Sequence, residues 1–128
     1  MKKLVVPIAV LALLGGRALL GAPPIQQEDA KAKAASWIAK GDSTKALVDG
    51  VLAAAVEAGA EKHAVAKDYV TDASRWMTEG DKSLKAAKEA FAAEDYVKAG
   101  NVGNMAWQYY VKSGTAAVLA NKLVSGGS

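Results

Sequence analysis

The sequence of 128 residues has no cysteine and a single histidine, His63. Without cysteine the chain can form neither a disulfide nor a thiolate metal site, and it has no lipobox for lipid attachment. One histidine excludes histidine-rich zinc sites, paired-histidine haem ligation and most hydrolytic triads. The sequence also lacks a Gly-x-Ser-x-Gly motif, a P-loop, a His-Glu-x-x-His motif and a dinucleotide-binding fingerprint. We therefore predict a protein without enzyme activity, cofactor or bound metal.

Proline is also scarce, with three residues, whereas alanine supplies 28 of the 128. This balance favours helix, because alanine loses no side-chain entropy in a helix and proline interrupts one. Hydrophobic residues make up 52% of the chain and charged residues 23%, which is too apolar for intrinsic disorder. The length suits one small domain, so we predict a single all-α domain.

An excess of one charge sign occurs only at the N-terminus. The formal net charge of +3 comes from 16 basic and 13 acidic residues, and Lys2, Lys3 and Arg17 lie in a stretch without acids. The rest of the chain is neutral, since 16 minus 3 leaves 13 basic residues against 13 acidic ones. Its lysines and acids are interspersed rather than gathered into a stripe that could neutralise phosphates. We therefore expect no nucleic-acid partner.

A long apolar run occupies residues 4–14, after the positive start of the chain. Its length is typical of the apolar segment of a signal peptide and is too short to span a bilayer. Gly16 and Ala18 place small residues at the −3 and −1 positions of a cleavage site after Ala18. We predict a signal peptide at 1–18 and a periplasmic or secreted protein. An uncleaved single-pass membrane anchor at 1–22 is the alternative, and membrane contact is expected only if this leader is retained.

The remaining chain has helical periodicity almost to its end. We predict a linker at 19–25, a helical domain at 26–124 and a disordered tail at 125–128. Within the domain the pattern indicates helices at about 26–40, 43–58, 61–79, 82–93, 95–112 and 115–124. Glycines mark predicted breaks at Gly41, Gly59, Gly80 and Gly114. The expected fold is an alanine-rich antiparallel bundle of two to three helical hairpins after an apolar leader helix.

Two segments echo each other at a spacing of 39 residues, at Gly41-Asp42 and Gly80-Asp81. The segment Gly41-Asp42-Ser43-Thr44-Lys45-Ala46 is similar to the corner of a tetratricopeptide-like helical hairpin, and Glu94-Asp95-Tyr96-Val97-Lys98-Ala99 resembles the same corner with its glycine replaced. The resemblance implies stacked hairpins and a scaffold that binds peptides or proteins. The spacing and the missing closing proline depart from that family. Any alanine-rich antiparallel helix pair also needs such a corner.

Two groups of polar residues have spacings that would suit a metal site or a catalytic pair. Glu61 and His63 are two residues apart, on different faces of a helix, and stand at a predicted helix start, so we interpret them as solvated cap residues. Asp68 and Asp72 share a helix face, which is the minimum geometry for a metal site or an acid/base pair. Arg75 follows Asp72 by three residues, and we predict a surface ion-pair cluster without a catalytic role.

Aromatic residues lie on two stripes with helical spacing: Val65, Tyr69, Ala73 and Trp76, and then Tyr96, Ala99, Gly103, Ala106 and Tyr110. Both stripes are predicted to pack in the core, with Trp76 buried. Trp107, Tyr109 and Tyr110 fall within four residues and cannot all face one core. Aromatic residues are enriched at interfaces, so we predict Trp107 or Tyr109 as a contact with a protein partner.

These observations predict an exported, non-enzymatic binding or adaptor module of the cell envelope that acts through protein–protein contacts. The alternative is a membrane-anchored structural subunit of a larger envelope or virion-type assembly, held by an uncleaved leader. In both cases the partner is a protein, and an oligomer of the chain is compatible with either.

Overall fold

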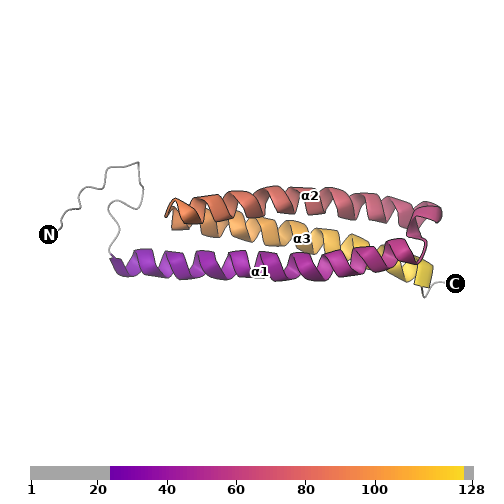
Figure 1. Cartoon of the computed structure of the whole chain (residues 1–128), viewed down its shortest axis with the longest axis horizontal. Helices are drawn as coiled ribbons and strands as arrows, with labels where there is room; N and C mark the ends of the chain where they lie inside the picture. The colour runs from indigo at the N-terminus through magenta and orange to yellow at the C-terminus, as the bar shows by residue number, and fades with distance from the viewer. Residues whose placement is uncertain (1–23, 126–128) are drawn as a thin grey trace.

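The computed structural model describes residues 24–125, which form three long antiparallel helices (Figure 1). These are α1 (Pro24–Glu57), α2 (Ala64–Ala92) and α3 (Tyr96–Ser125), with a short 3₁₀ helix, η3 (Ala60–Lys62), between α1 and α2. No strand occurs in this range, and the all-α prediction is confirmed. Helix α3 packs extensively against both other helices, whereas α1 and α2 contact each other much less. The molecule is a three-helix bundle in which α3 provides most of the contacts.

Several of the segments predicted at the ends of the chain lie outside residues 24–125. The signal peptide predicted at 1–18 and the anchor predicted at 1–22 lie outside the described residues, as do residues 126–128. Pro24 and residue 25, placed in the predicted linker, belong to the first turn of α1, where proline is well tolerated. Ser125, placed in the predicted tail, is the last residue of α3. Among the helices of residues 24–125, none is long and apolar enough to cross a membrane.

Three of the four glycine breaks predicted from the sequence are wrong. Gly41 lies inside α1, Gly80 inside α2 and Gly114 inside α3, so the six predicted helices merge into three. The hairpin corner predicted at Gly41–Ala46 is therefore continuous helix. The corner predicted at Glu94-Asp95 does separate α2 from α3.

These glycines lie where neighbouring helices approach closely. A Cβ atom added at Gly80 would lie 2.6 Å from Cε1 of Tyr110, and one added at Gly41 would lie 3.1 Å from Cδ1 of Leu84. A glycine inside a helix weakens that helix by about 1 kcal/mol relative to alanine. Here the missing side chain makes room for a large neighbour, so tertiary packing outweighs the breaking tendency of glycine.

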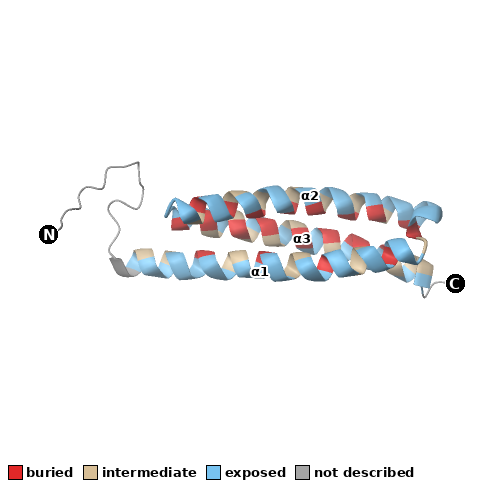
Figure 2. Cartoon of the chain, in the orientation of Figure 1, coloured by how far each residue is buried: buried red, intermediate tan, exposed pale blue. Residues whose placement is uncertain are grey.

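The buried residues recur at heptad spacing and are mostly small. In α1 they lie seven residues apart, at Ala34, Gly41, Val48 and Ala55. In α3 all five members of the predicted stripe are buried, which confirms it, and the line continues through Ser113, Ala117 and Ala120. Small side chains let the helices pack closely around a few large ones, of which Tyr110 is fully buried. Figure 2 shows buried residues along α2 and α3, whereas the visible side of α1 is mostly exposed, with single buried residues at intervals.

The stripe predicted in α2 is wrong for most of its members. Ala73 is buried, but Tyr69 and Trp76 are only half-buried and Val65 is exposed. The buried face runs instead through Ala66, Val70, Ala73, Met77, Gly80, Leu84 and Ala87. Most of these residues are small and give little hydrophobic signal, whereas the larger aromatic residues at the edge of the face suggest a different orientation of the helix.

Two residues in the left-handed backbone region end α1 and α2. Gly59 has φ 97° and ends α1, as predicted. Glu94 has φ 64° after α2, and the backbone N–H of Asp95 donates to the carbonyl of Ala90 at 2.9 Å. This hydrogen bond is typical of a Schellman motif, in which glycine usually takes the position of Glu94.

Candidate functional site

An apolar groove of about 470 Å³ runs between α1 and α3, and its walls carry no charged side chain. Helix α1 contributes Leu47 and Val51 to it, and α3 contributes Val111, Val118 and Leu119. Leu47 is 72% exposed, Val118 43% and Val111 41%. Single exposed apolar residues are ordinary, whereas several around one concavity are typical of binding surfaces. The sequence prediction does not include these residues, although they lie at helical spacing outside the buried lines.

Trp107, the first predicted contact, lies on the α3 face that leads to this groove. It precedes Val111 by four residues and therefore lies one helical turn away. Its half-buried ring packs against Trp37 of α1, with centroids 5.5 Å apart. The Lys40 ammonium lies 4.6 Å from the Trp37 centroid and 5.2 Å from that of Trp107. This cation–π cluster joins α1 to α3 beyond one end of the groove.

Tyr109, the second predicted contact, lies between α3 and α2 instead. Its ring stacks on Trp76, with centroids 5.7 Å apart and an interplanar angle of 16°. Lys112 lies 4.5 Å from the Trp76 centroid, and Arg75 lies 5.4 Å from it. The three neighbouring aromatic residues of α3 therefore separate, with Tyr110 in the core and the other two at different helix pairs. The structure does not bring Trp107 and Tyr109 into one site.

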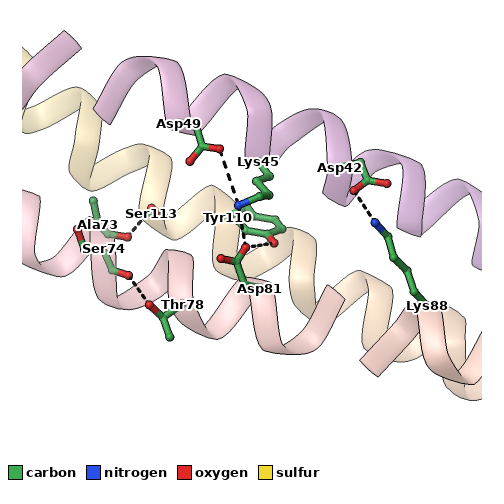
Figure 3. Close-up of polar contacts among 10 residues, drawn as sticks. All are labelled: Asp42, Lys45, Asp49, Ala73, Ser74, Thr78, Asp81, Lys88, Tyr110 and Ser113. Atoms are coloured by element: carbon green, nitrogen blue, oxygen red, sulfur yellow. Dashed lines mark hydrogen bonds and ion pairs between the residues drawn. The ribbon is translucent and has the colours of Figure 1, made fainter. Parts of the chain in front are cut away.

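A polar network connects the core to the surface near the middle of the bundle (Figure 3). The Tyr110 ring is fully buried, and its hydroxyl donates to Oδ1 of Asp81 at 2.6 Å. Nζ of Lys45 donates to the same oxygen at 3.1 Å and lies 3.8 Å from Oδ2 of Asp49. Gly80-Asp81, the second of the two similar Gly-Asp pairs, thus has a packing role. Gly80 makes room for the Tyr110 ring, and Asp81 accepts a hydrogen bond from its hydroxyl.

The protonation of this network follows from burial and hydrogen bonding. Burial raises the pKa of the Tyr110 hydroxyl well above its ordinary value, and the hydrogen bond to Asp81 raises it further. The hydrogen bond to Asp81 also raises the pKa of Lys45. Both groups therefore stay protonated near neutral pH, and neither can act as a general base.

A second hollow, of about 500 Å³, lies between α1 and α2 and is bordered by this network. Two of its three lysines are paired, because Lys45 contacts Asp81 and Nζ of Lys88 lies 3.0 Å from Oδ1 of Asp42, whereas Lys85 forms no ion pair within the described residues. These contacts are largely exposed and link α1 to α2 across the hollow. The hollow therefore combines ion pairs between helices with charged side chains of both signs, Lys85 and Glu89, along its border.

The polar groups singled out in the sequence have structural roles. His63 caps α2, where its Nδ1 accepts a hydrogen bond from the backbone N–H of Ala66 at 3.2 Å, and it is exposed as predicted. Arg75 and Asp72 form the predicted ion pair at 3.2 Å. Within residues 24–125, no three histidine, aspartate or glutamate side chains gather as metal ligands would.

Comparison with known proteins finds no match among protein-family models, curated proteins or solved structures. The α1–α3 groove is an apolar feature of the described residues that the packing of a single chain leaves open.

Proposed function

We propose that the chain is an exported, non-enzymatic binding module of the cell envelope and that its contact surface is the α1–α3 groove. The proposal rests on one observation, the gathering of exposed Leu47, Val111 and Val118 around an uncharged concavity. A partner that covers these side chains removes them from water, which favours association by about 25 cal/mol for each Å² of apolar surface. The partner that suits the groove is the apolar face of a protein helix.

The shape and chemistry of the groove support this choice of partner. Its walls are two helix surfaces, on which side chains form ridges three and four residues apart. A third helix can lay its own ridges between them, as in other helix-in-groove complexes. Because no charged residue lines the groove, an acidic or basic peptide strand or a nucleic acid would gain little binding free energy there.

The two aromatic contacts predicted from the sequence take different places in this proposal. Trp107 lies one turn from Val111 and would border a helix bound along the groove. Tyr109 packs with Trp76 between α2 and α3, so it belongs to a different surface. Its role as a partner contact stays a prediction that the proposed groove does not use.

Position-specific photocrosslinking in cells that express the full chain tests the proposal. A photoreactive amino acid replaces Val118 in the groove, or Val65 on α2 as the matched control, because Val65 is an equally apolar residue with 51% exposure. We expect a covalent protein adduct from position 118 that is absent from position 65. Equal adducts from both positions, or none from position 118, would contradict the proposal.

The alternative proposal, a structural subunit of a larger envelope or virion-type assembly, uses the same groove. It differs in the fate of the leader, which would be retained as an anchor. Intact mass of the purified protein separates the two. Loss of residues 1–18 supports the exported module, and a full-length chain that requires detergent supports the anchored subunit.

A further inference from the structure

We infer that one side of α3 rests on the surface of an anionic lipid membrane, beside the α1–α3 groove and without need of the leader. This side, called here the α3 outer face, consists of Lys98, Met105, Lys112, Leu119 and Lys122, all of them exposed. The inference goes beyond the proposed function, which concerns the groove alone. It also differs from the expectation drawn from the sequence, in which membrane contact depends on a retained leader.

The helical positions of these residues turn the α3 outer face away from the bundle. Lys98, Met105, Lys112 and Leu119 follow one another every seven residues, and each comes two residues after a buried member of the line that begins at Tyr96. Two residues correspond to about 200° of rotation around a helix. The face is therefore opposite the buried line, where a flat surface can reach it.

Helix α3 differs from the other two helices in charge. It contains three lysines, Lys98, Lys112 and Lys122, and no acidic residue. By contrast, α1 contains five acidic residues and four lysines, and α2 contains five acidic and five basic residues. Within residues 24–125, none of the three α3 lysines forms an ion pair. Among the three helices, α3 is therefore the one that attracts an anionic surface.

The same helix also exposes the most large apolar side chains. Of the eight large hydrophobic residues that are exposed in the described range, five lie on α3. Met105, with 46% exposure, and Leu119, with 38%, alternate with the lysines along the α3 outer face. Such side chains enter the boundary between lipid headgroups and acyl chains, while neighbouring lysines keep their ammonium groups among the phosphates. The alternation therefore suits a lipid surface.

The spacing of the lysines favours an extended surface over a small anion. At 1.5 Å per residue, about 21 Å of helix axis separates Lys98 from Lys112, and about 15 Å separates Lys112 from Lys122. A single phosphate or carboxylate can reach one of them only. A nucleic acid presents phosphates over such lengths, but its backbone offers no apolar surface to Met105 or Leu119. A membrane supplies many anionic headgroups together with an apolar interior.

Sedimentation with lipid vesicles tests the inference on the chain as it is recovered from cells. Vesicles of equal parts phosphatidylglycerol and phosphatidylcholine should bind the chain, vesicles of phosphatidylcholine alone should bind it far less, and added salt should weaken binding. Lys98 lies outside the groove, and Lys98→Gln should weaken binding about fivefold, the effect of one lysine near an anionic surface. Lys67→Gln, at an exposed lysine of α2, is the matched control and should change binding little.

The apolar contact is tested at Met105, which also lies outside the groove. Met105→Asp should sharply reduce binding to the anionic vesicles, whereas Val65→Asp on α2, at a residue of similar exposure, should not. Because the chain has no cysteine, a polarity-sensitive fluorophore can be attached to Met105→Cys or to Val65→Cys alone. Anionic vesicles should shift the emission to shorter wavelengths at position 105 and leave it unchanged at position 65.

A retained leader would bind vesicles whatever residue stands at position 105, so binding that is unaffected by Met105→Asp would overturn the inference. Equal binding to neutral vesicles, or no binding by the wild-type chain, would also overturn it. A chain that binds soluble polyglutamate but not vesicles would assign the face to an acidic protein instead. Failure of vesicle binding together with a protein adduct from position 118 would leave the proposed function standing. Vesicle binding without that adduct would remove the proposed function alone.

Discussion

Changing glycine to alanine at two helical positions should alter stability in opposite directions. In an open helical position this change stabilises the folded state by about 0.8–1 kcal/mol, because alanine restricts the unfolded chain and favours helix. Gly50 is such a position, since an added Cβ meets nothing within 4 Å. We therefore expect Gly50→Ala to stabilise the monomer by up to about 1 kcal/mol.

Gly80→Ala carries the same helical gain but meets the Tyr110 ring. The new Cβ would lie 2.6 Å from Cε1 and 2.8 Å from Cδ1, which is closer than two carbon atoms can approach. The ring is fully buried, and its hydroxyl is held by Asp81 at 2.6 Å, so it cannot move without losing that hydrogen bond. Overpacking costs about 1–3 kcal/mol and a lost hydrogen bond about 1 kcal/mol. After subtraction of the helical gain, Gly80→Ala should destabilise the fold by about 1–3 kcal/mol.

Urea unfolding followed by circular dichroism at 222 nm measures both changes, at a protein concentration low enough to keep every variant monomeric. The two variants share their chemistry, so the difference between them reports the packing of the Tyr110 ring. If Gly80→Ala proved as stable as Gly50→Ala, the close contact between α2 and Tyr110 would not exist and the assigned role of Gly80 would be wrong.

Three further predictions concern the network, the α2–α3 corner and the leader. Tyr110→Phe should cost about 1 kcal/mol near neutral pH, because the folded chain loses the hydrogen bond to Asp81. The raised pKa of Tyr110 means that the unfolded chain releases its proton near pH 10 while the folded chain retains it, so wild-type stability should fall above pH 10. Phenylalanine should reduce this fall, and identical urea midpoints against pH for both proteins would contradict the network. Glu94→Gly should raise the melting temperature, because the left-handed backbone at Glu94 costs about 1–2 kcal/mol for a residue with a side chain. An unchanged or lower melting temperature would argue against that conformation. Intact mass of the expressed protein should show loss of residues 1–18, whereas a full-length mass would favour the anchor.

Much of the bundle could be predicted because some residues give the same signal locally and in the folded chain. The line from Tyr96 to Tyr110 combines large and small apolar residues at heptad spacing, and all of its members are buried. Gly59 has no close neighbour and a left-handed backbone, so it ends its helix as a glycine ordinarily does. At such positions the local conformational preference and the tertiary packing agree, so the sequence alone is sufficient to predict burial or a helix end.

The errors arise where packing between distant helices decides the outcome. Gly41 and Gly80 look like helix breaks, but they make room for Leu84 and Tyr110 from other helices. Nothing within a few residues of either glycine reveals that neighbour. The α1–α3 groove could not be predicted for the same reason, because its walls come from residues 44–51 and 110–119, which are distant in the sequence. Trp107 and Tyr109 could be identified as residues that share no single core, but not as members of different helix pairs.

The claim that the α1–α3 groove is a protein contact surface is tested most directly by crosslinking from position 118, with and without Leu47→Lys. If the groove is the contact surface, the photoreactive residue at position 118 should give a protein adduct, and adding Leu47→Lys should sharply reduce it. The control at position 65 should give no adduct. An adduct from position 118 that is unchanged by Leu47→Lys, or matched by one from position 65, would contradict the claim.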